Sequence, residues 1–331
     1  MHKGLLRFEF FLNQLETIIL KADKQKNPGL FLYKNNARTP LFMLEALSKM
    51  YAEIHNKKKF SKLKEHFKLL EDALGTIDYY DAIAKKISSN KKMPPKILQY
   101  LQAQTREKIQ HLNDVLAERN WVDSNNERIL KIRNKLSDAD WLNDEKEIAA
   151  IQSFYTKAIK SIDAFTKSTA CHFDNMEEDV HELRRKLRWL SIYPQALQGC
   201  IQLADNNKKV KQLAKYLTKE IVGSPFNKMP DAGNNKNFVL LDKNYFLSLS
   251  WMIDALGKLK DNGLTVVAVK EALQQTENAT EAAAEKKVYQ LLGTKQIKLS
   301  KLLGSAESIC KTYFKEHNLE HLVLGVGKKC N

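Results

Sequence analysis

The stretch Val180–Leu190 reads Val-His-Glu-Leu-Arg-Arg-Lys-Leu-Arg-Trp-Leu, and its pattern predicts a helix with two contrasting faces. At about 100° per residue, the histidine and the three arginines fall within about 100° of arc. These four residues are His181, Arg184, Arg185 and Arg188. The opposite side carries only apolar residues, namely Val180, Leu183, Leu187 and Leu190. We therefore expect a helix whose apolar face packs in the core and whose basic face can meet an anion.

Apolar residues recur at helical spacing along most of the 331 residues. The chain has 12 Gly and 7 Pro, which is too few for the many turns of a sandwich or barrel, so an all-α fold is predicted. The expected helices cover about 5–22, 39–55, 59–75, 76–89, 94–117, 124–137, 143–167, 176–203, 207–222, 243–257, 265–290 and 294–316. Thr39 is expected to cap the second of these and Gly75 to end the third, while Val323–Gly327 is predicted as a short extended tail.

The tetrapeptide Asp-Ala-Leu-Gly occurs twice, at Asp72–Gly75 and at Asp254–Gly257. A break at Cys171–Asn175 lies between the two copies, and Asp174 or Asn175 can cap the helix that follows it. We therefore predict a single domain over 1–331 built from two similar antiparallel helical bundles, at about 1–168 and 169–331.

The formal net charge of +15 predicts an anionic partner. Only nine of the cations are arginines, and three of these fall within five residues, at 184, 185 and 188. Clustered guanidinium groups suit phosphate and carboxylate oxygens. The four cysteines form no CxxC pair, and we find no signal peptide and no long apolar run. A cytoplasmic location away from membranes is expected.

Two lysine-rich segments extend the basic pattern. On a helix over 207–222, four lysines would share one face, namely Lys208, Lys211, Lys215 and Lys219. In the segment 57–68, Lys58 and Lys62 share a face. Solvated surface is the ordinary role of such lysines, and it stays an alternative for both segments.

The spacing His-x-x-Arg-x-x-x-Arg at His181, Arg184 and Arg188 resembles the signature helix of the CHAD family (conserved histidine α-helical domain). The segments Leu74–Asp81 and Ala255–Asp261 resemble the Leu-Gly turns of that family. The resemblance implies two pseudo-symmetric helical bundles around a basic central cleft. It also implies binding of inorganic polyphosphate without catalysis and without a cofactor, and it leaves association with polyphosphate granules open.

The first half departs from this pattern. Aligning Leu44 and Leu47 with Leu187 and Leu190 places Arg38 where His181 stands. Leu41 and Glu45 then replace the two motif arginines, and Asp78 replaces the expected basic residue. We therefore predict that the site depends mainly on the second half. The predicted polyphosphate-binding residues are His181, Arg184, Arg185, Arg188, Lys208, Lys211, Lys215, Lys219, Lys260, Arg38, Lys58 and Lys62.

Two other functions remain open. The first is an RNA- or DNA-binding helical protein, although Trp189 is the one aromatic residue beside the arginine face. The second is a helical scaffold for an acidic protein. An enzyme is not expected, because the sequence has no P-loop and no GxSxG elbow. The pair His317 and His321 has the i,i+4 spacing of metal ligands, but we interpret it as a helix end and predict no metal site.

Overall fold

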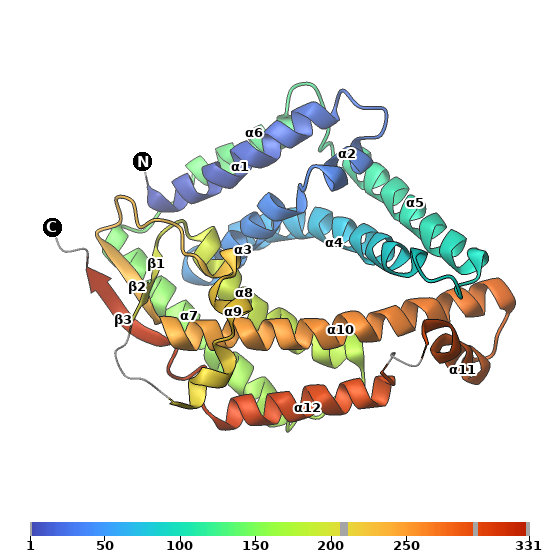
Figure 1. Ribbon diagram of the computed structural model, residues 1–331. Coiled ribbons are helices and arrows are strands. Elements are labelled where there is room, and N and C mark those ends of the chain that lie inside the picture. Colours follow the sequence, from blue (N-terminus) through green and yellow to red (C-terminus); the bar gives the residue numbers. More distant parts are fainter. Residues whose placement is uncertain (1, 206–210, 294–296, 329–331) are drawn as a thin grey trace.

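The computed structural model describes residues 2–205, 211–293 and 297–328, and this part of the chain is mostly helical, as predicted (Figure 1). The first half contains α1 (Lys3–Ala22), α2 (Pro28–Lys34), α3 (Arg38–Ile54), α4 (Lys57–Ser88), α5 (Pro95–Glu118), α6 (Glu127–Ser137) and α7 (Asp144–Ser168). The second half contains η1 (Met176–His181), α8 (Glu182–Ala196), η2 (Lys211–Tyr216), α9 (Lys219–Val222), η3 (Pro225–Asn227), α10 (Lys243–Glu277), α11 (Glu281–Leu292) and α12 (Leu299–Lys315). Among the described residues, no helix is long and apolar enough to cross a membrane.

A small three-stranded sheet accompanies the helices. Strand β1 (Ile201–Ala204) runs parallel to β2 (Asn237–Asp242), and β2 runs antiparallel to β3 (Val323–Lys328). The extended tail at 323–327 was predicted, but β1 and β2 were not. The predicted helix 176–203 ends at Ala196 instead, because Gln198 and Gly199 take left-handed backbone conformations. A Cβ atom on Gly199 would lie 2.0 Å from the carbonyl oxygen of Asp231, so only glycine fits under this loop.

Two predicted helix breaks are wrong. Helix α4 continues through Gly75, and α10 continues through Gly257. Each glycine lies under an arginine, since a Cβ atom on Gly75 would come within 2.9 Å of Arg38 Nη2 and one on Gly257 within 3.0 Å of Arg184 Nε. These glycines therefore allow a guanidinium to approach the helix backbone and do not end the helix.

The start of α3 also differs from the prediction. The cap position is Ala37, whose side chain makes no capping hydrogen bond, and Thr39 lies inside the helix. The Thr39 hydroxyl donates to Asn36 Oδ1 at 3.0 Å. Between the first two expected helices the structure adds α2, which was not predicted and which Asn27 caps by accepting a hydrogen bond from the Leu30 backbone N–H.

The apolar side chains form two separate cores. The larger core joins α1, α3, the first part of α4, the end of α5, α6, α7, α8, the start of α10 and α12. The smaller core joins the end of α4 and the start of α5 to α10 and α11, with residues such as Ile87 and Leu101 packed among Val269 and Leu273. In Figure 1, α4 and α10 cross the middle of the molecule, with α3 and α8 toward one end and α11 at the other.

A buried ion pair fixes α1 within the larger core. Arg7 Nη1 lies 2.8 Å from Glu147 Oε2, and Arg7 Nε donates to the carbonyl oxygen of Leu197 at 3.1 Å. The Tyr51 hydroxyl donates to the other carboxylate oxygen of Glu147 at 2.7 Å. These bonds connect α1 and α3 with α7 and the end of α8. Because each charge is buried, removing one partner would leave the other without compensation.

Candidate anion-binding site

The helix that carries the arginines begins in a π-helical turn. Asn175 caps η1 by accepting hydrogen bonds from the backbone N–H groups of Glu177 and Glu178, as one of the two predicted caps. The predicted apolar face is confirmed, since Val180, Leu183, Leu187 and Leu190 are fully buried. Burial of that face turns the side chains of His181, Arg184, Arg185 and Arg188 away from the core.

Two of these four side chains are paired with carboxylates on their own helix. The ring of His181 lies 2.6 Å, through Nδ1, from Glu177 Oε1, and this contact holds the pKa of Glu177 below its usual value. Arg185 Nη2 lies 2.6 Å from Glu182 Oε2. Both pairs are solvent-accessible, and partners of this kind exchange readily for another anion.

Arg184 reaches the neighbouring helix α10. Its Nε donates to the carbonyl oxygen of Ile253 at 3.1 Å, and its guanidinium lies over Gly257. Burial lowers the pKa of Arg184, although Asp261 and Asp254 oppose that effect. The side chain is thus anchored through one nitrogen, and its two terminal nitrogens make no ion pair with the described residues.

Arg188 has surroundings unlike those of His181, Arg184 and Arg185. Its guanidinium lies 4.6 Å from the centre of the Phe42 ring, and no described carboxylate forms an ion pair with it. Burial, followed by the charges of Arg184 and Arg38, lowers the pKa of Arg188 to about 10, although Glu71 and Asp78 oppose that effect. Arg38 and Arg184 are therefore close enough to repel Arg188.

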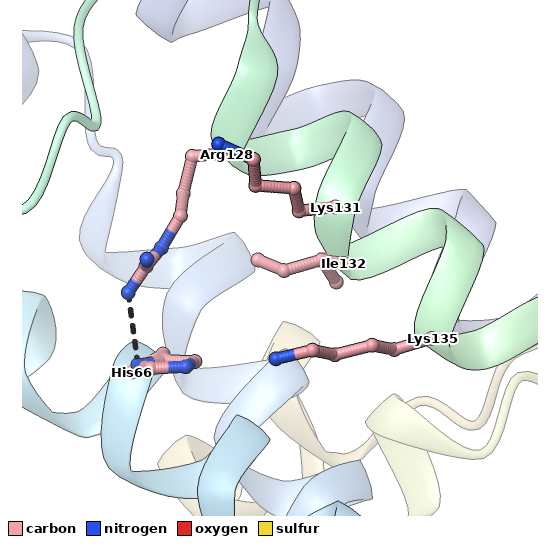
Figure 2. A pocket seen from close by; sticks show the side chains of 5 residues that line it. All are labelled: His66, Arg128, Lys131, Ile132 and Lys135. Carbon is pink, nitrogen blue, oxygen red and sulfur yellow. Dashed lines mark hydrogen bonds between the residues drawn. The ribbon is translucent and has the colours of Figure 1, made fainter.

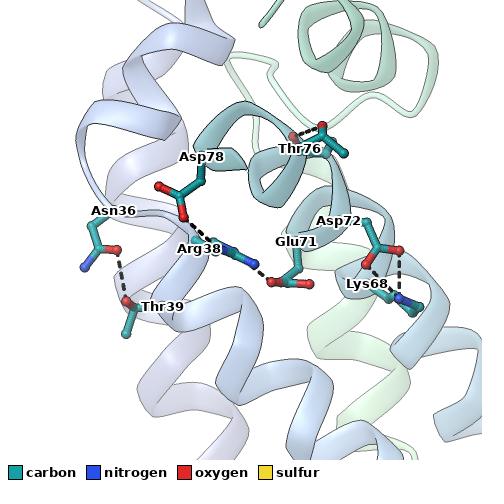
Figure 3. Close-up of polar contacts among 9 residues, drawn as sticks. Asn36, Arg38, Thr39, Lys68, Glu71, Asp72, Thr76 and Asp78 are labelled. Carbon is teal, nitrogen blue, oxygen red and sulfur yellow. Dashed lines mark hydrogen bonds and ion pairs between the residues drawn. The ribbon is translucent and has the colours of Figure 1, made fainter. Parts of the chain in front are cut away.

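Arg38 is neutralised by acids of α4. Its Nε donates to Glu71 Oε1 at 2.8 Å, and its Nη1 to Asp78 Oδ2 at 3.2 Å, as Figure 3 shows. Arg38 meets Gly75 in the same way that Arg184 meets Gly257. This contact parallels that of Arg184 with Gly257, whereas the sequence alignment placed Arg38 opposite His181.

Acidic and basic groups also meet where α3 faces α8. Glu45 is 5% exposed, and burial, followed by the nearby Glu71 carboxylate, raises its pKa to about 7. Lys49 lies 4.8 Å from the centre of the Trp189 ring, and Trp189 also packs on Phe42 at 5.1 Å. Trp189 is thus covered by two side chains of α3, Phe42 and Lys49.

The predicted lysine stripe does not form. The segment Lys211–Tyr216 is a short 3-10 helix, and Lys219 begins a separate turn after Thr218, so the lysines share no continuous helical face. Lys215 is instead paired with Glu316 at 2.5 Å. Lys208 lies outside the described residues. Leu213 and Tyr216 of this segment are buried, and the Tyr216 ring packs on Trp251 of α10 and Tyr313 of α12.

The remaining predicted lysines are dispersed. Lys260 on α10 is paired with Asp261 at 2.9 Å, and its charge contributes to the low pKa of Glu177 beside His181. Lys58 and Lys62 are exposed near the start of α4. At 1.5 Å per residue, Lys62 lies about 20 Å along the helix from Gly75, so neither lysine joins the arginines.

The structure also places a basic pocket where no site was predicted. Figure 2 shows His66 of α4 facing Arg128 and Lys135 of α6. The signal in the sequence was the spacing of Arg128, Lys131 and Lys135, which puts three cations on one side of a short helix. That signal is common on solvated helices, so the pocket depends on which helix α6 packs against.

No family model matches this sequence, and searches of curated proteins and of solved structures found no match.

The histidine pair interpreted as a helix end follows α12. There His317 takes a left-handed backbone conformation, and its Nδ1 lies 2.8 Å from Glu320 Oε1.

Proposed function

We propose that this protein binds inorganic polyphosphate through the cluster Arg38, Arg184 and Arg188, with His181 and Arg185 at its edge, and that it does so without catalysis. The observation that carries the proposal is Arg188, a partly buried guanidinium with no carboxylate partner among the described residues. Two further arginines contribute to its lowered pKa. A bound polyanion would supply the missing counter-charge and relieve the repulsion.

We also propose that the chain is a divergent member of the CHAD family. Support comes from the repeated contact of an arginine on one helix with a glycine inside a long neighbouring helix, once at Arg38 and Gly75 and once at Arg184 and Gly257. Under this proposal α3–α4 and α8–α10 are equivalent elements of two pseudo-symmetric halves. The cations would then line a central cleft between them.

The two halves would contribute unequally. Arg38 already has two carboxylate partners, Glu71 and Asp78, so a phosphate must compete for it. Arg184 and Arg188 have none among the described residues, so they are the stronger binding groups. An arginine whose pKa stays near 10 remains protonated at neutral pH, which suits binding and not proton transfer.

The test is a titration with long-chain polyphosphate over a series of salt concentrations. We compare wild type with Arg184→Ala/Arg188→Ala, and use Arg106→Ala as the matched control, because Arg106 is exposed on α5. Two charge-assisted hydrogen bonds at roughly 1.5 kcal/mol each predict about 100-fold weaker binding by the double variant. The slope of log affinity against log salt should fall by about 1.4, at about 0.7 per lost contact.

Unchanged affinity and slope in the double variant would refute the site, and no salt-dependent binding by wild type would refute the function. Arg188→Met retains most of the packing on Phe42 and guards against a folding defect. RNA is the competitor to test. Proteins that bind single-stranded RNA stack its bases on exposed aromatic side chains. We expect RNA to compete poorly, because Trp189 is covered by Phe42 and Lys49. RNA that displaces polyphosphate at equal phosphate concentration would favour the nucleic-acid alternative.

A further inference from the structure

A second basic site lies away from the arginine cluster, between α4 and α6 (Figure 2). The cavity has a volume of about 110 Å³ and is lined by one apolar side chain and four nitrogen-bearing ones. These are Ile132, His66, Arg128, Lys131 and Lys135. A cavity of about 150 Å³ can hold benzene, so this one has room for a single small ion.

Arg128 is held rigidly at one side of the cavity. Its Nη2 lies 3.0 Å from His66 Nδ1, and its guanidinium carbon lies 5.4 Å from the centre of the Trp121 ring. A guanidinium only donates hydrogen bonds, so Nδ1 accepts, and the neutral imidazole carries its proton on Nε2. The Nε atom of Arg128 is buried and has no hydrogen-bond partner among the described residues.

The charges around the cavity are almost all positive. Burial, followed by the charges of Arg128, Lys135, Arg119 and Lys62, lowers the pKa of His66 to about 4. Lys131 is paired with Glu127 at 2.9 Å, but within the described residues no carboxylate pairs with Arg128 or Lys135. Cations gathered without counter-charge repel one another, and an anion in the cavity would remove that repulsion.

We propose that this cavity binds one phosphate-like oxyanion, held by Arg128 and Lys135 and by the Nε2–H of His66. A tetrahedral anion has enough oxygens to accept from all three groups at once. Arg128 needs little ordering on binding, because Trp121 and His66 already fix its plane. In Figure 2, the side chain of Lys135 extends toward the His66 ring, which leaves the two groups facing a common space.

This site is independent of the proposed polyphosphate cluster. His66 lines the cavity and lies nine residues before Gly75, where Arg38 packs, which is about 14 Å along α4. The same chemistry fits free inorganic phosphate and the terminal phosphate of a chain. A comparison of inorganic phosphate with tripolyphosphate separates these two sources.

The experiment follows the imidazole NMR signals of His66 during titration with inorganic phosphate, sulfate and tripolyphosphate. The signals are assigned with His66→Gln. We expect a saturable shift with inorganic phosphate or tripolyphosphate, and at least ten-fold weaker binding by Lys135→Gln. Lys160→Gln, which removes an exposed lysine of α7 outside the cavity, should bind as wild type does.

Sulfate keeps its charge between pH 5 and 8, so any pH effect on its binding reports the protein. His66 faces Arg128, Lys131 and Lys135 on α6, Arg119 after α5, and Lys62 on its own helix. Since a bound dianion favours protonated His66, sulfate should bind more tightly as the pH falls, and it should raise the apparent pKa of His66.

Tighter binding of inorganic phosphate would identify free phosphate as the occupant, and tighter binding of tripolyphosphate would identify a chain end. No saturable shift with either, or unchanged affinity in Lys135→Gln, would overturn the proposal. The His66 shift must also persist in Arg184→Ala/Arg188→Ala. If the polyphosphate proposal fails, the His66 result is therefore unaffected. If the His66 proposal fails, the polyphosphate titrations are likewise unaffected.

Discussion

Glu45 should make the protein less stable as the pH rises through neutrality. It lies on α3, is 5% exposed, and has a pKa raised from 4.5 to about 7 by burial and then by the carboxylate of Glu71. Between these two pH values the folded protein binds more protons at this position than the unfolded chain. Stability from this group is therefore complete below pH 4.5 and is lost as the pH approaches 7.

The difference between 4.5 and about 7 corresponds to roughly 3 kcal/mol. The substitution Glu45→Gln keeps the shape of the side chain and removes its titration. We expect the variant to be more stable than wild type at pH 8 by up to about 3 kcal/mol. The advantage should shrink steadily toward pH 4.5, where the wild-type carboxyl is protonated.

The assay is urea unfolding of wild type and variant at several pH values between 4 and 8. The matched control is Glu53→Gln, which removes an exposed carboxylate from the same helix. The control should change stability by a few tenths of a kcal/mol with little dependence on pH. A Glu45→Gln difference that is the same at pH 4 and pH 8, or a less stable variant at pH 8, would refute the reasoning.

Three other changes test the remaining features. Gly257→Ala should weaken polyphosphate binding several-fold in titrations, because the new Cβ atom would lie 3.0 Å from Arg184 Nε. Its melting temperature should hold or rise, since alanine favours a helix interior over glycine by about 0.5–1 kcal/mol. Glu147→Gln should cost roughly 3–5 kcal/mol in chemical unfolding, because it leaves Arg7 buried without its counter-charge. Wild type should lose stability as the pH falls from 6.5 toward 4, where His66 must take up a proton in the folded state, and His66→Gln should lack that loss in pH-dependent melts.

The sequence alone predicted the helical class and which face of the helix at Val180–Leu190 is buried. Apolar residues at helical spacing mark the side of a helix that packs in the core, so this face could be predicted directly from the residues. The break at Cys171–Asn175 and the extended tail at Val323–Gly327, which lies within β3, were also predicted, because helix caps and short extended segments are local features.

Local sequence patterns gave wrong predictions for two glycines and for one lysine-rich segment. Gly75 and Gly257 resembled helix ends, but each lies inside a long helix where an arginine from a neighbour packs against the backbone. The lysines of 207–222 fitted a helical stripe, but among the described residues Lys211–Tyr216 is a short 3-10 helix and Lys219 begins a separate helix after Thr218.

The tertiary structure alone decided which charges meet. Arg38 is neutralised because α4 carries Glu71 and Asp78 alongside it, whereas Arg188 meets an aromatic ring on α3. The pocket at His66 exists because α6, which packs on α1, brings Arg128 and Lys135 beside α4. Periodicity along one helix determines which residues face outward. The charge that each of these residues meets depends on a second helix far away in the sequence, so only the packing of the two helices decides it.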